Sequence, residues 1–148
     1  MFRQNMLLIL LDLAGKIRGS TRLQKEVFLA QKEANVPFGY DFELYHYGPF
    51  SSQIFSDIED LEKNNLIRRE ISTITTLEGT ETKRIDYTLT PEGKHLAASL
   101  TSNRHRLKEI VDKYNDKPLW ELLRYVYGKY VWPKKWPREQ STLASFLE

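Results

Sequence analysis

The spacing of apolar residues predicts three helices in the first half of the chain. Residues 3–14 are apolar on nearly every side, which indicates a helix buried at the centre of a domain. A second helix begins at Ser20 or Thr21, either of which can cap it, and ends near Asn35. Residues 50–64 form a third helix, because their apolar positions fall on one side of a helical wheel. These positions are Phe50, Ile54, Ile58 and Leu61.

Alternating patterns predict extended structure on either side of the third helix. In residues 38–48 every second position is apolar or aromatic, which is typical of a strand. Two runs rich in β-branched residues, 67–75 and 83–89, flank a polar tip that contains Gly79. This second pattern predicts a β-hairpin, because strands separated by a short polar segment with a glycine pair with each other.

Helical spacing returns after the hairpin. Thr90 can cap a helix whose first position is Pro91, where the missing N–H of proline would have had no helical partner anyway. Residues 103–115 and 118–130 predict two further helices. The remaining residues up to 148 include two prolines, and we expect them to wrap the surface.

The order of these elements predicts an α+β, mostly helical fold. Three helices followed by a two-stranded hairpin is the order of a winged helix-turn-helix, here with a β-hairpin wing and additional C-terminal helices. We expect a single domain over residues 1–148, with its core in 1–100 and a C-terminal helical extension in 101–148. The third helix would then lie where such domains read DNA.

Composition narrows the chemistry without choosing a partner. The chain is 41% apolar and has no cysteine, so it can bury a core but forms no disulfide or thiolate metal site. Its formal net charge of +2 is too small to predict nucleic-acid binding by itself. No apolar run approaches the roughly 18 residues of a membrane span, and we expect a cytoplasmic protein that contacts no membrane.

Two stretches, "DLEKNNLIRRE" (60–70) and "KRIDYTLTPEGKHL" (83–96), resemble the second half of winged-helix regulators of the PadR and MarR types. The first half of the chain resembles a more specific group of proteins. "RLQKEVFLAQ" (22–31) and "YHYGPFS" (45–51) resemble the Panacea (SocA-like) antitoxin domain and related small prokaryotic winged-helix proteins, with Arg22 in place of the usual lysine. The resemblance implies a winged helix that acts either as a DNA-binding regulator or as a toxin-neutralising protein.

A DNA-binding function assigns roles to eight residues. Neutral hydrogen-bonding side chains at the start of the third helix would read bases, whereas its carboxylates begin only at residue 57. The base-reading residues are Ser51, Ser52, Gln53 and Ser56. Basic residues of the second helix and the hairpin would hold phosphates. These are Arg22, Lys25, Lys83 and Arg84, and the alternative is that they form a solvated surface.

Other chemistries have weaker support in the sequence. No catalytic motif is present and the three histidines lack metal-ligand spacing, so we expect neither an enzyme, a cofactor nor a metal site. Aromatic and basic residues alternate through 120–138, which favours core or interface packing over base stacking.

The hypothesis from sequence is therefore a homodimeric, winged-helix transcriptional regulator that binds double-stranded DNA. The alternative is an antitoxin or adaptor-type protein-interaction module with the same fold, in which the acidic third helix belongs to the surface that binds a partner such as a toxin.

Overall fold

The computed structural model describes residues 2–45 and 48–132, which form an α+β fold dominated by helices. Its elements run in an order close to that predicted from the sequence. They are α1 (Phe2–Ala14), β1 (Ile17–Arg18), α2 (Ser20–Glu33), β2 (Glu43–Tyr45), β3 (Gly48–Phe50), α3 (Ser52–Lys63), β4 (Ile67–Thr75), β5 (Glu81–Leu89), α4 (Pro91–Ala98), α5 (Arg104–Tyr114), α6 (Leu119–Val126) and the π-helical turn η1 (Tyr127–Val131).

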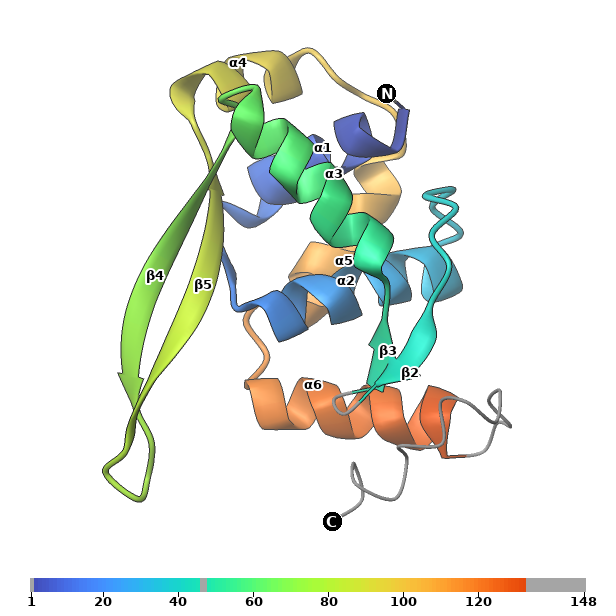
Figure 1. Cartoon of the computed structure of the whole chain (residues 1–148). Coiled ribbons are helices and arrows are strands. Elements are labelled where there is room, and N and C mark those ends of the chain that lie inside the picture. The colour runs from blue at the N-terminus through green and yellow to red at the C-terminus, as the bar shows by residue number, and fades with distance from the viewer. Residues whose placement is uncertain (1, 46–47, 133–148) are drawn as a thin grey trace.

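The strands form two small antiparallel sheets. β5 lies between β1 and β4, with Ile17 opposite Tyr87 and Ile67 opposite Leu89. The β4–β5 hairpin projects away from the helices, whereas β2 and β3 pair only with each other and lie near α6 (Figure 1). The predicted hairpin is confirmed, but β1 was not predicted, because two residues are too few for a period to appear.

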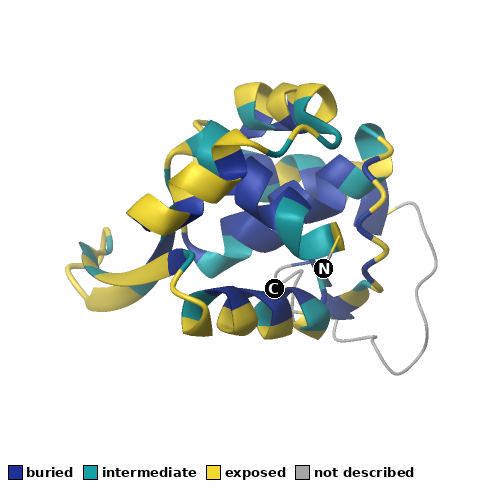
Figure 2. Cartoon of the chain, turned by 90° about the horizontal axis from the view of Figure 1, so that it is seen from above, coloured by how far each residue is buried: buried dark blue, intermediate teal, exposed yellow. Residues whose placement is uncertain are grey.

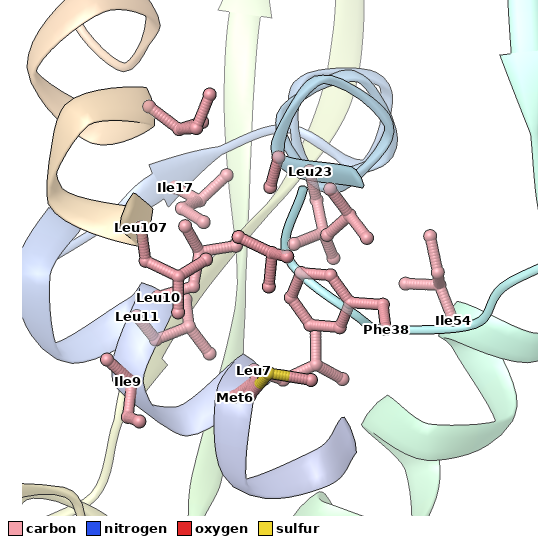
Figure 3. Packing of buried hydrophobic residues seen from close by; sticks show 14 of the residues in the cluster. Met6, Leu7, Ile9, Leu10, Leu11, Ile17, Leu23, Phe38, Ile54 and Leu107 are labelled. Atoms are coloured by element: carbon pink, nitrogen blue, oxygen red, sulfur yellow. The ribbon is translucent and has the colours of Figure 1, made fainter. Parts of the chain in front are cut away.

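The helix α1 occupies the centre of the core. Its six consecutive residues Met6–Leu11 are all buried, and α1 packs against α3, α4, α5 and β5 (Figure 2). Figure 3 shows apolar side chains from neighbouring elements converging on it, among them Leu23 of α2, Ile54 of α3 and Leu107 of α5. The uniformly apolar run in the sequence therefore predicted the central position correctly.

Of the two predicted helix N-caps, the one at α4 is present in the structure and the one at α2 is not. Thr90 caps α4, because its hydroxyl accepts a hydrogen bond from the Gly93 N–H. The predicted cap of α2 is wrong. The N-cap is Gly19, with a φ of 98° that favours glycine, and Ser20 lies inside the helix with its hydroxyl 2.7 Å from that of Tyr87.

The segment between α2 and α3 is only partly a strand. Residues 38–42 form no ladder, although the predicted alternation is confirmed, with Phe38, Tyr40 and Leu44 buried. The helix α3 begins at Ser52 rather than residue 50, because Phe50 belongs to β3. No helix of the described ranges is long and apolar enough to cross a membrane.

The C-terminal extension is fastened to the end of α2 by one carboxylate. Glu33 accepts hydrogen bonds from the hydroxyls of Tyr114, Tyr125 and Tyr130 and from the ammonium of Lys129. These donors come from α5, α6 and η1, so all three elements are tied to α2. Within the aromatic and basic stretch, Tyr125 and Tyr130 therefore pack inward as expected, whereas Trp120 and Trp132 are exposed. The part of the stretch beyond residue 132 lies outside the described residues, as does the tail expected to wrap the surface.

We predict that Glu33→Gln destabilises the protein at neutral pH but much less at pH 3. Burial alone would raise the pKa of Glu33, but the three tyrosine hydroxyls and the ammonium outweigh burial and lower the pKa to about 2. A carboxylate with a lowered pKa contributes full stability above its unfolded value of 4.5, and this contribution is lost as the pH falls toward 2. The expected loss at pH 7 is on the order of 2–3 kcal/mol, measured by urea unfolding.

Tyr125→Phe is the matched control, because it removes one of the four donors and leaves the charge in place. It should give a smaller loss. Equal stability of the wild type and Glu33→Gln at pH 7 would show that the carboxylate does not fasten the extension.

Candidate functional site

The predicted base-reading residues at the start of α3 have different environments. Ser52 and Ser56 are exposed, but Ser51 is only 1% exposed. The side chain of Gln53 accepts a hydrogen bond from the Asp41 N–H at 2.9 Å, which ties it to the segment before β2. Two of the four residues are therefore available at the surface without breaking an internal contact.

The two residues of α2 predicted to bind phosphates are buried, which removes the role that we expected for them. Arg22 is 7% exposed and donates to the Tyr114 carbonyl at 3.0 Å. Lys25 is 2% exposed and donates to the Pro49 carbonyl at 2.9 Å. Burial lowers the pKa of Lys25 to about 7. Neither side chain reaches the surface that a DNA backbone would touch.

The two basic residues of β5 do not act together. Successive side chains of a strand point to opposite faces, so Lys83 and Arg84 lie on different sides of the hairpin. Arg84 holds Asp86 through two hydrogen bonds of 2.7 and 3.0 Å, and Asp86 is buried. Of the predicted phosphate-binding residues, Lys83 is the one that is exposed and forms no ion pair within the described part of the chain.

The carboxylates of α3 divide between structure and surface. Asp57 is buried, where it accepts hydrogen bonds from Arg3 and from the Tyr40 hydroxyl at 2.7 and 2.6 Å. Glu62 pairs with Arg69 of β4 at 2.6 Å. The remaining two, Glu59 and Asp60, are exposed on the helix. The outer surface of α3 is therefore acidic.

The "RLQK" stretch of α2 and the "YGPFS" stretch before α3 are in contact in the structure. Gln24 of the "RLQK" stretch makes a reciprocal pair of hydrogen bonds with the backbone of Ser51, at 2.9 Å to its carbonyl and 2.8 Å from its N–H. The adjacent Lys25 holds the Pro49 carbonyl, as described above. Gly48 has a φ of 96°, and a β-carbon there would lie 3.4 Å from the Lys25 Cε. We call these contacts between α2 and the "YGPFS" stretch the clasp.

The clasp holds the β2–β3 hairpin so that it closes one side of a cleft of about 460 Å³. The other sides are the start of α2, residues 55–59 of α3 and the β4–β5 hairpin. Figure 1 shows how these elements are arranged around the β2–β3 hairpin. The apolar walls are Tyr45, Phe50, Phe55, Ile58, Ile85 and Tyr87. The polar lining is Ser20, Thr21, Gln24, Lys25, Glu59 and Arg69.

Aromatic rings give the cleft a continuous wall. The ring of Phe50 lies edge-on to Tyr45 at 4.8 Å and to Phe55 at 5.5 Å between centroids. Such edge-to-face pairs hold each ring in place and leave the wall preformed. The sequence analysis did not find this site. One feature of the sequence could have pointed to the cleft, namely the aromatic residue Tyr45 among the otherwise polar positions of the alternating segment.

No group of three or more histidine, aspartate or glutamate side chains in the ranges 2–45 and 48–132 could hold a metal ion. The arrangement of the cleft instead suits binding, because apolar walls with a few placed polar groups are typical of recognition sites.

We predict that Gln24→Ala loosens the β2–β3 hairpin and lowers the free energy of unfolding by about 1–3 kcal/mol. The substitution leaves the buried N–H of Ser51 without a partner, which costs about 1–3 kcal/mol. The Ser51 carbonyl loses the Gln24 amide but keeps the Ile54 N–H at 3.3 Å. Urea unfolding measures the loss, and amide hydrogen exchange locates it.

Gln31→Ala is the matched control, since Gln31 makes the same reciprocal pair with the Tyr40 backbone farther along α2. Faster exchange in β3 should follow the loss of Gln24 and not the loss of Gln31. Unchanged exchange of β3 in Gln24→Ala would rule out the clasp as the anchor of the hairpin.

No protein-family model matches the chain, and a search of curated proteins finds no relative.

Proposed function

We propose that the chain is a winged-helix protein that acts as a protein-interaction module of the adaptor or antitoxin type. The order α1, β1, α2, α3, β4, β5 and the strand order β1-β5-β4 support the winged-helix assignment. The cleft between α3 and the β4–β5 hairpin would receive an apolar segment of the partner protein.

The observation behind the proposal is the apolar surface that begins in the cleft and continues onto the hairpin. Ile85 lines the cleft, and its partner across the strands, Ile71, is 68% exposed. Tyr45 on the opposite wall is 46% exposed. A contiguous apolar surface of this kind is costly in water, and on soluble proteins it marks a place where another molecule binds.

The charge of the same face supports a protein rather than DNA as the partner. The helix α3 has four carboxylates and one basic residue, Lys63, which gives a net charge of −3. Residues 67–89 of the hairpin have four basic and four acidic residues and are neutral. DNA binding depends on basic side chains that neutralise phosphates, and this face offers no excess of them.

The second candidate is a homodimeric DNA-binding transcriptional regulator. It is favoured by the position of two arginines at the start of α2, where a winged helix meets the DNA backbone. Arg18 is exposed, and the aliphatic part of Arg84 packs against Gly19, 3.4 Å from where a β-carbon would be. In this case Arg18 and Arg84 would hold phosphates, whereas Lys83 lies on the other face of the hairpin.

We predict that Ile71→Ser weakens partner binding about tenfold or more, because burying an isoleucine side chain contributes about 1.5–3 kcal/mol. The binding partners would be peptides selected from a random phage-displayed library on the wild-type protein, with affinities measured by isothermal titration calorimetry. Leu77→Ser is the control, because Leu77 is even more exposed than Ile71 but lies at the hairpin tip, outside the cleft. Equal effects of the two substitutions, or selected peptides that shift no cleft resonance in NMR spectra, would contradict the proposal.

The same protein should bind DNA weakly and without sequence preference. Fluorescence anisotropy with the duplex upstream of its own gene and a scrambled duplex, across a salt series, measures both properties. A clear preference for its own duplex, with a salt slope that flattens in the Arg18→Ala/Arg84→Ala variant, would instead establish the second candidate.

A further inference from the structure

The cleft is lined by a buried lysine, Lys25, whose amino group has one hydrogen-bond partner within the described residues. Lys25 lines the cleft but is only 2% exposed. Its ammonium has three N–H donors, and within the described residues its hydrogen-bond partner is the Pro49 carbonyl alone, at 2.9 Å. A buried ammonium without a counter-charge is costly, so an anion that reaches Lys25 would be bound strongly.

The start of α2 adds positive potential at the same place. Ser20 and Thr21 line the cleft in the first turn of this 14-residue helix, whose N-cap, Gly19, has no side chain to satisfy the free N–H groups. The N-terminus of a helix has a partial positive charge that favours anions. Two independent features of the cleft floor, a lysine and a helix start, therefore attract negative charge.

The other ionisable side chains of the cleft limit how much negative charge can enter. Glu59 of α3 is exposed at the rim and repels a polyanion. Arg69 of β4 already pairs with Glu62, and the hydroxyl of Tyr87 is engaged with Ser20. Tyr45 of β2 is part of the aromatic wall. The cleft thus suits one anionic group surrounded by apolar atoms.

We propose that the partner's segment presents a carboxylate next to an apolar or aromatic side chain, that Lys25 receives the carboxylate, and that the aromatic walls hold the apolar side chain. This inference rests on the proposed function and names the chemistry of the partner. A protein segment fits better than a small molecule, because the apolar surface continues from Ile85 out to the exposed Ile71, beyond the cleft itself. An aspartate, a glutamate or a C-terminal carboxylate supplies the required group.

The test uses the peptides selected on the wild-type protein from the random library. Most of them should contain an acidic residue within two positions of an aromatic or aliphatic one. Synthetic peptides in which that residue is replaced by its amide, Asp→Asn or Glu→Gln, should bind at least about tenfold more weakly, since hydrogen bonds between charged groups are the strong ones. In Lys25→Met the acidic peptide and its amide should bind with equal affinity.

A second measurement covers the case in which Lys25→Met releases the β2–β3 hairpin. At pH 8 a carboxylate that pairs with Lys25 should draw a proton onto the lysine, because burial lowers the pKa of Lys25 to about 7 in the free protein. Calorimetry in two buffers of different ionisation enthalpy should therefore detect proton uptake with the acidic peptide and none with its amide.

The outcomes separate this inference from the proposed function. Peptides that shift cleft resonances but show no preference for the acid and no proton uptake would overturn the inference and leave the interaction module in place. Failure to select any peptide that binds the cleft would overturn both.

Discussion

The hydrogen bonds from Gln24 and Lys25 to the backbone before α3 are the constraint on which the rest of the face depends. They fix the β2–β3 hairpin to α2, and the hairpin in turn sets where α3 begins and where the wall of Phe50 and Tyr45 lies. Backbone groups of an inserted segment must find partners when buried, and two adjacent polar side chains on one helix supply them. Without these bonds the cleft would lose one side.

The same contacts explain why the sequence predicted the helices well and the functional residues poorly. Helical periodicity is a property of each segment alone, and α1, α3 and the hairpin were predicted close to their true ends. Whether the side chains of Arg22 and Lys25 are buried or exposed depends instead on which segments pack over α2. Residues far along the chain cover it, with Tyr114 accepting from one side chain and Pro49 from the other. No local pattern reports such contacts.

Because other segments pack over both sides of α2, the carboxyl group of Glu26 also lies in the core. Glu26 is fully buried and its two oxygens have no hydrogen-bond partner within the described residues. Burial raises the pKa of Glu26 to about 8, against the opposing charge of Arg22, so the group is largely protonated at neutral pH. The polar residues of α2 that suggested a solvated or DNA-facing helix are thus internal, and the exposed chemistry of the protein lies on α3 and the hairpins.

The hydrogen bonds from three tyrosine hydroxyls to Glu33 limit how far the protein can be shortened from its C-terminal end. Because the donors come from α5, α6 and η1, a shortened version ending after α4 would expose the apolar side of α2 and leave this carboxylate without its partners. The last helices are consequently part of the folding unit rather than an appendage. Gene fusions and minimal versions of the protein should retain the sequence through residue 132 at least.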